Sequence, residues 1–348
     1  MHNHSLYSHT MVRFTVLASG SKGNSTVVCG GRTRILVDAG LSCRELFRRM
    51  KIAGEDPETL DAIVITHEHQ DHINGLAVTA RKLNIPVYFT EATHRAWMRW
   101  LTPRRQMTYA QWLEQCRRQT AERQAERDAA VDEGEPDEPE AGMQAEAGSQ
   151  ATAEALSSSN SSVSVVDAEP AATSTAKDDP TWLPAVEYFE AGQPFAIGDL
   201  SLSPFTIPHD AADPVGFVFA AEGVRMGFAT DLGYISPNVK AQLQRVDLLL
   251  LESNHDLEML RDGPYPWSVK QRVMSRVGHL SNEAAAEFLA TAYDGQAAYV
   301  ILAHLSESNN LPELARVTAD RALNGRASLL ANRLIVAEQH HPMASITF

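Results

Sequence analysis

Short runs of apolar residues, each closed by a turn or a helical stretch, recur along most of this 348-residue chain. Runs of this length, rich in Val, Ile and Leu, predict buried strands. Because each predicted strand is followed by a turn or a helix, the pattern favours an α/β sandwich. The predicted strands cover residues 12–17, 25–29, 34–37, 61–65, 87–90, 200–207, 215–220, 224–229, 246–252, 298–303 and 333–337.

Helices are predicted between these strands from their start signals. Ser42 and Glu45 form a capping box, and Ser236 precedes a proline at a first helical position. Ser281 or Asn282 caps a later helix. The predicted helices cover residues 43–50, 73–83, 93–127, 238–245 and 283–293, and one more begins at Pro312.

The hydrophobic pattern fails in the middle of the chain. Residues 133–180 consist largely of Ala, Ser, Glu, Pro, Gly and Thr. Such a segment cannot bury enough surface to offset its chain entropy, so we expect it to be disordered. We interpret residues 103–182 as a low-complexity acidic insertion in a single domain that spans residues 11–348, after an N-terminal extension at 1–10. An inert solvated linker is favoured over an acidic partner-binding segment.

The formal net charge of −14 is concentrated in this insertion. Residues 121–180 carry 15 acidic and 3 basic side chains, whereas the rest of the chain carries 29 and 27. The part predicted to fold is therefore nearly neutral. It has no basic stripe with interleaved aromatic residues, so the electrostatic footprint of a strong nucleic-acid binder is missing.

Cysteine usage and the lack of long apolar runs bear on the compartment. Cys29, Cys43 and Cys116 form neither a C-x-x-C pair nor an even framework, which fits a reducing compartment. No apolar run reaches membrane-spanning length, and the start of the sequence lacks the features of a signal peptide. We therefore expect a cytoplasmic protein without membrane contact, and the sequence leaves the oligomeric state open.

Directly after the strand predicted at 61–65, residues 66–72 read Thr-His-Glu-His-Gln-Asp-His. Buried imidazoles each need a polar partner, and one divalent metal can serve several of them. In an extended segment His67 and His69 point the same way and can grip one ion. Asp71 and His72 lie where the chain should turn into a helix and can grip a second ion. Imidazole and carboxylate suit Zn, Mn or Fe; the alternative is a polar loop that is rich in His.

Further candidate ligands follow strands in the second half of the chain. His209, Asp231 and His304 each follow a predicted strand within two residues, and His279 precedes a predicted helix. One such residue alone is a weak signal, because a single strand-end histidine is more often structural. Together they favour a shared site, since loops at strand ends carry function in layered α/β folds.

With these residues the chain resembles the metallo-β-lactamase superfamily, whose hallmark is H-x-H-x-D-H after a strand, then a His, a bridging Asp and a last His. The resemblance covers residues 11 to about 323 apart from the insertion. It implies a four-layer αββα sandwich of two mixed sheets with two divalent ions at one edge, Zn²⁺ first and Mn²⁺ as the alternative. The implied ligands are His67, His69 and His209 for one ion, Asp71, His72 and His304 for the other, Asp231 between them, and Asp38 as a support for the ligands.

Other segments are similar to nucleases of this superfamily. Residues 208–217 resemble the His and Gly-aromatic segment of ribonuclease Z, and Glu252 with His279 resembles its pair of Glu and catalytic His. Residues 19–25, 252–256, 262–267 and 303–306 look closest to the bacterial YycJ/WalJ group, which is associated with DNA exonuclease activity. The acidic insertion departs from that group.

The resulting hypothesis is phosphodiester hydrolysis. Two metals lower the pKa of a bridging water to about 7 and hold a hydroxide for in-line attack on phosphorus. Asp71 or Asp231 orients the nucleophile. His279 protonates the leaving oxygen and Glu252 fixes its tautomer; the alternative for His279 is a ring that caps a helix.

The expected substrate is nucleic acid, with DNA first, and the resemblance implies 5′-to-3′ exonuclease action. The alternatives are an RNA-processing nuclease, a small-molecule phosphodiesterase or ester hydrolase, and a non-catalytic binding protein that retains the fold. His255 is either a substrate contact or a hydrogen-bonded loop residue. Four cations are candidate phosphate contacts, although exposed solvated charge is favoured for each alone: Lys22, Arg261, Lys270 and Arg272.

Overall fold

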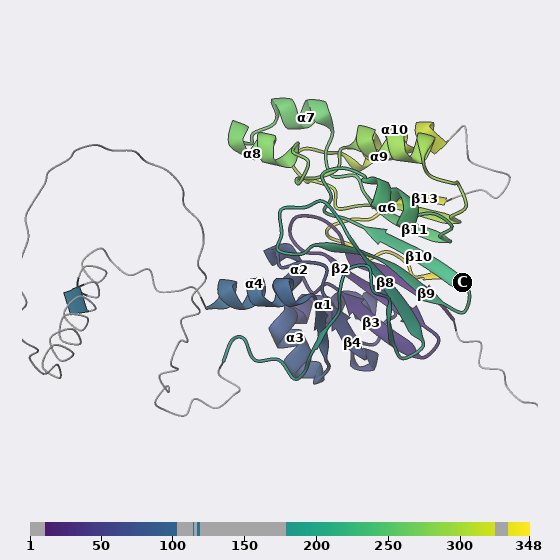
Figure 1. Cartoon of the computed structure of the whole chain (residues 1–348). Helices are drawn as coiled ribbons and strands as arrows, with labels where there is room; N and C mark the ends of the chain where they lie inside the picture. The colour runs from purple at the N-terminus through teal and green to yellow at the C-terminus, as the bar shows by residue number, and fades with distance from the viewer. Residues whose placement is uncertain (1–10, 103–113, 115–116, 119–178, 324–332) are drawn as a thin grey trace, which may run out of the picture. The chain divides into compact units, whose positions relative to one another are not determined.

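The computed structural model describes residues 11–102, 114, 117–118, 179–323 and 333–348. Within these residues two seven-stranded sheets pack against each other, and helices cover their outer faces (Figure 1). This is the four-layer αββα sandwich that the resemblance implied. The expected extension at 1–10 and nearly all of the expected insertion lie outside the described residues.

The first sheet combines strands from both ends of the described chain. Its order is β14-β1-β2-β3-β4-β5-β6, antiparallel from β14 to β3 and parallel from β3 to β6. Since β6 follows the expected insertion in sequence, residues from both sides of it complete one sheet. The strands are β1 (Arg13–Ala18), β2 (Ser25–Gly30), β3 (Thr33–Val37), β4 (Ala62–Val64), β5 (Val87–Phe89), β6 (Val186–Tyr188) and β14 (Ile346–Thr347).

The second sheet repeats this plan. Its order is β13-β12-β11-β10-β9-β8-β7, antiparallel from β7 to β10 and parallel from β10 to β13. In both sheets the middle strand pairs in antiparallel with one neighbour and in parallel with the other. This strand is β3 in the first sheet and β10 in the second. The strands are β7 (Phe195–Ile197), β8 (Leu200–Thr206), β9 (Val215–Ala221), β10 (Val224–Ala229), β11 (Leu248–Glu252), β12 (Tyr299–Ala303) and β13 (Arg333–Val336).

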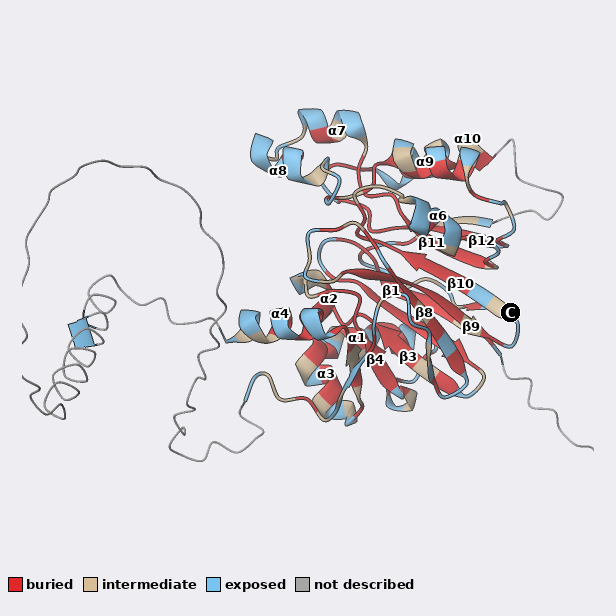
Figure 2. Ribbon diagram, viewed as in Figure 1, coloured by how far each residue is buried: buried red, intermediate tan, exposed pale blue. Residues whose placement is uncertain are grey.

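Alternating side chains of the strands fill different layers, which explains why the strands read as continuous apolar runs. In β11, Leu248 and Leu250 face the core between the sheets, whereas Leu249 and Leu251 face the outer helices. Figure 2 shows most of the strands coloured as buried. Helices α1 (Cys43–Ile52), α3 (Leu76–Leu83) and α4 (Glu91–Leu101) cover the first sheet. Helices α6 (Pro237–Gln242), α9 (Asn282–Thr291) and α10 (Pro312–Leu323) cover the second.

Most predicted elements are present, but the helix expected at 73–83 is wrong in its start and continuity. The chain forms α2 (Gln70–Ile73) and then α3, with a break at Gly75. A Cβ on Gly75 would lie 1.9 Å from the Leu41 carbonyl oxygen, so the two backbones touch there. The chain therefore forms one short helix, α2, inside the histidine-rich segment and a second helix, α3, after the break.

Other differences concern short elements and caps. Of the capping box only one half forms: the Glu45 N–H donates to Ser42 Oγ, but the Glu45 carboxylate binds Arg48 and Arg49. Of the helix expected at 93–127, α4 ends at Leu101, and almost all of the rest lies outside the described residues. No prediction was made for β6, β7, β14, a 3₁₀ turn at Pro57–Thr59, α7 (Leu257–Asp262) or α8 (Trp267–Val273).

A membrane-spanning helix is not found in the described part of the chain, where none of the helices combines the necessary length and apolar character.

Candidate metal centre

The predicted ligands converge at one edge of the two sheets because they follow strands that end there. The loop with His67 follows β4, and Asp38 follows β3, which pairs with β4 in parallel. Asp231 and His304 follow β10 and β12, on either side of β11. The carboxyl ends of parallel neighbours meet at one edge, which is where α/β folds place their sites.

Three of the predicted ligands form a histidine group. Ring nitrogens of His67, His69 and His209 all lie within 4.8 Å of one another. His209 Nε2 and His69 Nδ1 are 3.2 Å apart, and the other nitrogen of His209, Nδ1, faces the Gly278 carbonyl oxygen at 3.0 Å. This contact with the carbonyl places the proton on Nδ1 and leaves Nε2 directed at the group.

A second group contains two histidines and a carboxylate. Asp71, His72 and His304 bring one ligand atom each within 4.8 Å of the others. His304 Nε2 is 3.3 Å from Asp71 Oδ2, and His72 Nε2 is 3.3 Å from Asp231 Oδ2. Asp231 also groups with His67 and His72, so it lies between the two sets.

The site fits a pair of divalent cations by its own chemistry. His67 Nε2 and Asp231 Oδ2 are buried and have no hydrogen-bond partner, a state that buried polar atoms rarely show. Burial holds the pKa of His67 well below its usual 6.5, so this ring is neutral and offers a lone pair. Burial opposes the charge on His72 too, but Asp231, Asp71 and Asp38 hold its pKa well above 6.5. These carboxylates favour a positively charged ring. A bound cation would supply that positive charge in place of a proton.

Asp38 lies behind the site, as predicted for a support. Its Oδ2 is 2.8 Å from His72 Nδ1 and accepts a hydrogen bond from Thr66 Oγ1 at 2.9 Å, while Oδ1 accepts one from the Thr66 N–H. The carboxylate thereby fixes the His72 ring with Nε2 turned toward Asp71 and Asp231.

Glu252 and His279 form the predicted pair beside these groups. His279 Nδ1 is 2.7 Å from Glu252 Oε1, and the His279 side chain remains 24% exposed, whereas that of Glu252 is fully buried. The same Oε1 is 3.0 Å from His304 Nδ1, so one carboxylate oxygen orients both rings. Burial would lower the pKa of His279, but Glu252 raises it above 6.5.

Three residues that the sequence did not single out also contact the site. Asn24 Nδ2 lies 3.1 Å from Asp71 Oδ2 and 3.0 Å from His72 Nε2. Ser19 Oγ accepts a hydrogen bond from the His304 N–H, and Asn254 donates to the His304 carbonyl. Ser19, Asn24 and Asn254 lie inside the stretches that resemble nucleases of the superfamily. This resemblance was the only feature of the sequence that could have identified them.

The backbone is unusual at three of the strand-end positions. Asp38, Asp231 and His304 have φ of 60°, 61° and 57°, in the left-handed region that most side chains avoid. Asp and His tolerate this region better than bulky or β-branched residues. Each residue lies one or two positions after the end of a strand, so the turn redirects its side chain from the sheet into the site.

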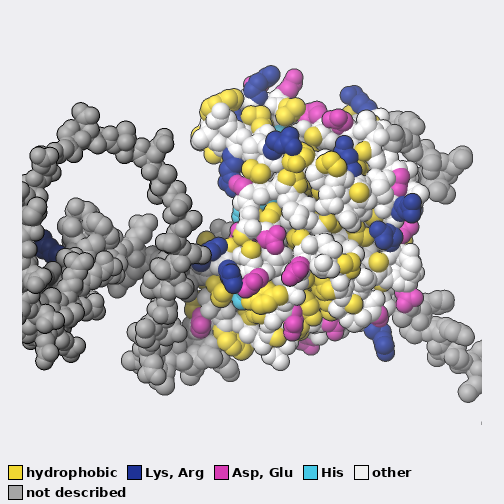
Figure 3. All heavy atoms as spheres, in the orientation of Figure 1, with side chains coloured by type: hydrophobic (Ala, Val, Ile, Leu, Met, Phe, Trp, Pro, Cys, Tyr) yellow, Lys and Arg dark blue, Asp and Glu magenta, His cyan; other side chains and the backbone are white. Residues whose placement is uncertain are grey.

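The candidate phosphate contacts and His255 do not gather at the centre. Arg261 pairs with Asp262, Arg272 pairs with Asp210, and Lys270 Nζ donates to backbone carbonyls. His255 is 1% exposed, which argues against a substrate contact. Figure 3 shows basic and acidic side chains interspersed on the face it presents, in keeping with the near-neutral charge. Lys22 lines a pocket together with a predicted ligand, Asp71.

The fold and the convergent ligands define a metallo-hydrolase of the αββα type. The family model of the metallo-beta-lactamase superfamily matches residues 18–269, and the chain belongs to this superfamily.

Two similar relatives are named as nucleases. The chain is 31% identical over 312 residues to exodeoxyribonuclease YycJ of Bacillus anthracis, covering 90% of this chain and 89% of the relative. It is 31% identical over 306 residues to exodeoxyribonuclease WalJ of Streptococcus pneumoniae, covering 88% and 86%.

A solved structure with a similar fold is the metallo-beta-lactamase fold protein YhfI from Bacillus subtilis. The TM-score is 0.56 at 15% sequence identity, and the match covers 96% of this chain and 99% of that one. The likeness therefore extends over both halves of the sandwich.

Proposed function

We propose that this protein is a metal-dependent DNA exonuclease that works in the 5′-to-3′ direction and is located in the cytoplasm. The observation that carries the proposal is the Glu252–His279 pair beside two groups of potential ligands. The names of the relatives favour DNA, and the direction rests on the resemblance to the YycJ/WalJ group.

In this proposal His67, His69 and His209 hold one divalent ion, Asp71, His72 and His304 hold another, and Asp231 lies between them. When bound, the two ions, Zn²⁺ first and Mn²⁺ as the alternative, would offset charge on the phosphate oxygens and lower the pKa of a water. Asp38 and Glu252 keep the His72 and His304 rings oriented for this purpose. Asp71 or Asp231 orients the attacking water.

His279 supplies the proton in this mechanism. Because Nδ1 faces Glu252 Oε1 at 2.7 Å, Nε2 is left to carry a proton to the leaving oxygen. Glu252 raises the pKa of His279 above its usual 6.5, which favours the protonated ring. Its partial exposure lets a polymer end approach the ring, whereas His304 on the same carboxylate is buried.

The test is a substrate comparison on protein loaded with Zn²⁺ or Mn²⁺. Single- and double-stranded DNA and RNA, labelled at either the 5′ or the 3′ end, are compared with bis-p-nitrophenyl phosphate. We expect stepwise release of mononucleotides from the 5′ end of DNA. His67→Ala should abolish turnover and bound metal, and His279→Ala should lower kcat about 100-fold or more while it retains the metal. His94→Phe, away from the site, is the control and should keep its activity.

Several outcomes would contradict the proposal. Turnover of the small diester alone would indicate a small-molecule phosphodiesterase, and faster turnover of RNA would indicate an RNA-processing enzyme. Retained activity in His67→Ala would exclude the metal mechanism. Absence of bound metal in the wild-type protein would favour a binding protein that keeps the fold.

A further inference from the structure

A polar pocket opens beside the candidate metal centre. It has a volume of about 380 Å³ and is lined by Ser21, Lys22, Gly40, Gln70, Asp71 and Asn74. Asp71 belongs to both the pocket and the second ligand group, so the pocket adjoins the centre. Its lining is polar, and Lys22 is the cation in it.

The turn that carries Lys22 is held in place by the loop before β14. The Lys22 N–H donates to Gln339 Oε1 at 2.8 Å, and Gln339 Nε2 donates to the Gly23 carbonyl at 3.0 Å. At the end of the turn, Asn24 contacts Asp71 and His72. The backbone of Lys22 is therefore fixed against the centre, while its side chain is 65% exposed and free to reorient.

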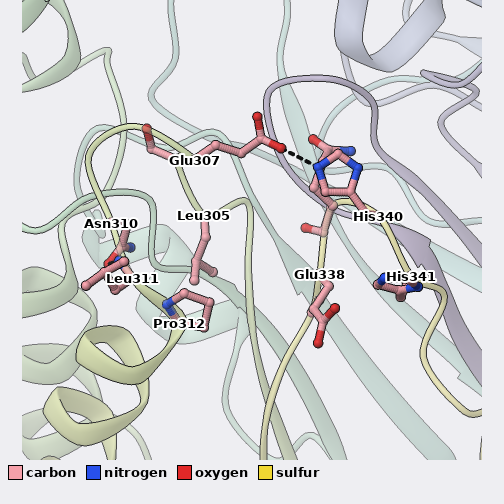
Figure 4. A pocket seen from close by; sticks show the side chains of 12 residues that line it. Leu305, Glu307, Asn310, Leu311, Pro312, Glu338, His340 and His341 are labelled. Atoms are coloured by element: carbon pink, nitrogen blue, oxygen red, sulfur yellow. Dashed lines mark hydrogen bonds and ion pairs between the residues drawn. The ribbon is translucent and has the colours of Figure 1, made fainter. Parts of the chain in front are cut away.

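Lys22 already has an anionic partner that can be exchanged. Its Nζ lies 2.5 Å from Glu307 Oε2, in an ion pair whose carboxylate is 34% exposed. The other oxygen, Oε1, is 2.6 Å from His340 Nε2, as the dashed line in Figure 4 shows. If Lys22 turns away, Glu307 keeps His340 as a partner. Exposed ion pairs contribute little to stability because water screens them, so the exchange costs little.

We propose that this pocket binds the phosphate next to the scissile one in a nucleic-acid strand, with Lys22 Nζ as the cation that Glu307 releases. The inference rests on the proposed function and names a contact for a second phosphodiester of the same strand. Lys22 binds and positions this phosphate; Glu307 competes with the phosphate for Lys22 and lowers the affinity.

Substitutions of Lys22 and Glu307 are expected to change the affinity for the strand in opposite directions. Lys22→Ala removes the cation and should weaken strand binding about fivefold, whereas Lys22→Arg should retain it. Glu307→Gln removes the competing charge and should tighten binding about twofold. If the ion pair only stabilised the fold, Lys22→Ala and Glu307→Gln would both bind the strand more weakly. Opposite changes in affinity therefore distinguish phosphate binding by Lys22 from a structural role.

Binding is measured by fluorescence anisotropy with a short fluorescein-labelled DNA whose linkages are phosphorothioates, at several salt concentrations. Lys22→Ala should reduce the slope of log K against log salt by about 0.7, the contribution of one phosphate contact to a single strand. In parallel, kcat/KM is measured with DNA and with bis-p-nitrophenyl phosphate, which has no second phosphate. Lys22→Ala should lower the value for DNA about fivefold and leave the value for the small diester unchanged. Arg48→Ala, which breaks the exposed pair with Glu45 on α1, is the matched control and should change neither.

Three results would overturn the inference: weaker binding in Glu307→Gln, an unchanged salt slope in Lys22→Ala, or an equal loss for DNA and the small diester in Lys22→Ala. If the wild-type protein hydrolyses neither substrate, the proposed function fails. The anisotropy series still decides the role of Lys22 in that case, because it measures binding without turnover.

Discussion

At the scale of single residues, Glu252 connects the parts of the centre. Its Oε2 accepts hydrogen bonds from the Leu232 and Leu280 N–H groups at 2.8 and 3.1 Å, while Oε1 faces His279 and His304. Burial alone would raise the pKa of Glu252, but His279 and His304 hold it below its usual value. The buried group is therefore an anion at neutral pH and can orient both rings.

Replacement of this anion tests whether it acts through His279. We expect Glu252→Gln to lower kcat about 100-fold with little change in KM, because the size is kept and the charge is lost. If the two residues act as one unit, the double variant with His279→Ala should be no slower than His279→Ala alone. Rates and bound metal are measured for each variant; multiplied losses at equal metal content would contradict the expected unit.

His94 on α4 predicts a pH effect away from the centre. It is buried, its ring stacks on Phe89 and Trp97, and its Nδ1 contacts Tyr188 Oη at 2.8 Å. Burial lowers the pKa of His94 below 6.5. Below pH 6.5 the unfolded chain therefore binds a proton that the folded chain resists, and stability falls as the pH falls until the folded pKa is reached.

The wild-type protein should thus lose more unfolding free energy than His94→Phe between about pH 7.5 and about pH 5.5. Urea denaturation of both proteins at the two pH values measures the difference. Only the pH-dependent part is compared, so the lost contact with Tyr188 cancels. Equal losses in the two proteins would show that His94 does not titrate abnormally.

The residues that approach the centre were predictable where they follow an apolar strand. His209, Asp231 and His304 could be predicted because each follows an apolar run that the sequence identifies as a strand. Asn24 and Ser19 could not, because their contacts depend on how the β1–β2 turn folds: Asn24 reaches the loop after β4, and Ser19 reaches His304 after β12. The left-handed backbone at Asp38 was equally hidden, since no local pattern distinguishes it from an ordinary strand end.

At the scale of elements, the break between α2 and α3 controls the shape of the histidine-rich segment. The Gly75 N–H donates to the Ala39 carbonyl at 2.8 Å, and a Cβ at position 75 would clash with the Leu41 carbonyl oxygen. Hydrophobic periodicity predicted one helix here because the apolar face continues through the break. Contact with a distant backbone segment, which periodicity does not record, decides the geometry.

Gly75→Ala should therefore be costly. The added Cβ would lie 1.9 Å from the Leu41 carbonyl oxygen, so the backbone must shift, and we expect a loss of about 3 kcal/mol in unfolding free energy. Urea denaturation measures this loss. The control is Gly54→Asn, where a Cβ meets nothing within 4 Å and the left-handed φ of 78° suits Asn. A loss below about 1 kcal/mol at Gly75 would contradict the close approach.

Short elements escaped prediction for physical reasons. β7 has three residues and β14 has two, too few to show alternation. α8 leaves Trp267 63% exposed and Val269 38% exposed, so it lacks the apolar stripe of a packed helix. The long strands and capped helices of the sandwich had clear patterns, and these were predicted.

At the scale of the whole molecule, the expected insertion between α4 and β6 should be dispensable for folding. Arg81 on α3 donates to the carbonyls of Asp179, Pro180 and Trp182 at 2.7–2.8 Å and so anchors the chain before β6. Replacing residues 103–178 with a flexible linker of about 15 residues should raise the unfolding free energy by about 1 kcal/mol, since a shorter loop costs less entropy.

This variant should also hydrolyse bis-p-nitrophenyl phosphate at the wild-type rate if the insertion has no part in the chemistry. Denaturation and turnover are measured together. Failure to fold would contradict the interpretation of residues 103–182 as an insertion, and loss of turnover in a folded variant would assign them a role in the reaction.

The position of β14 has a consequence for synthesis on the ribosome. β1 pairs with β14, and at the opposite end of the same sheet β5 pairs with β6. Both outer strands of the first sheet therefore emerge well after the strands they pair with, β6 after β5 and β14 after β1. Until then the nascent sheet has unpaired backbone groups on both sides, which other chains can pair with. This strand order therefore requires that the nascent chain be protected from such pairing during translation.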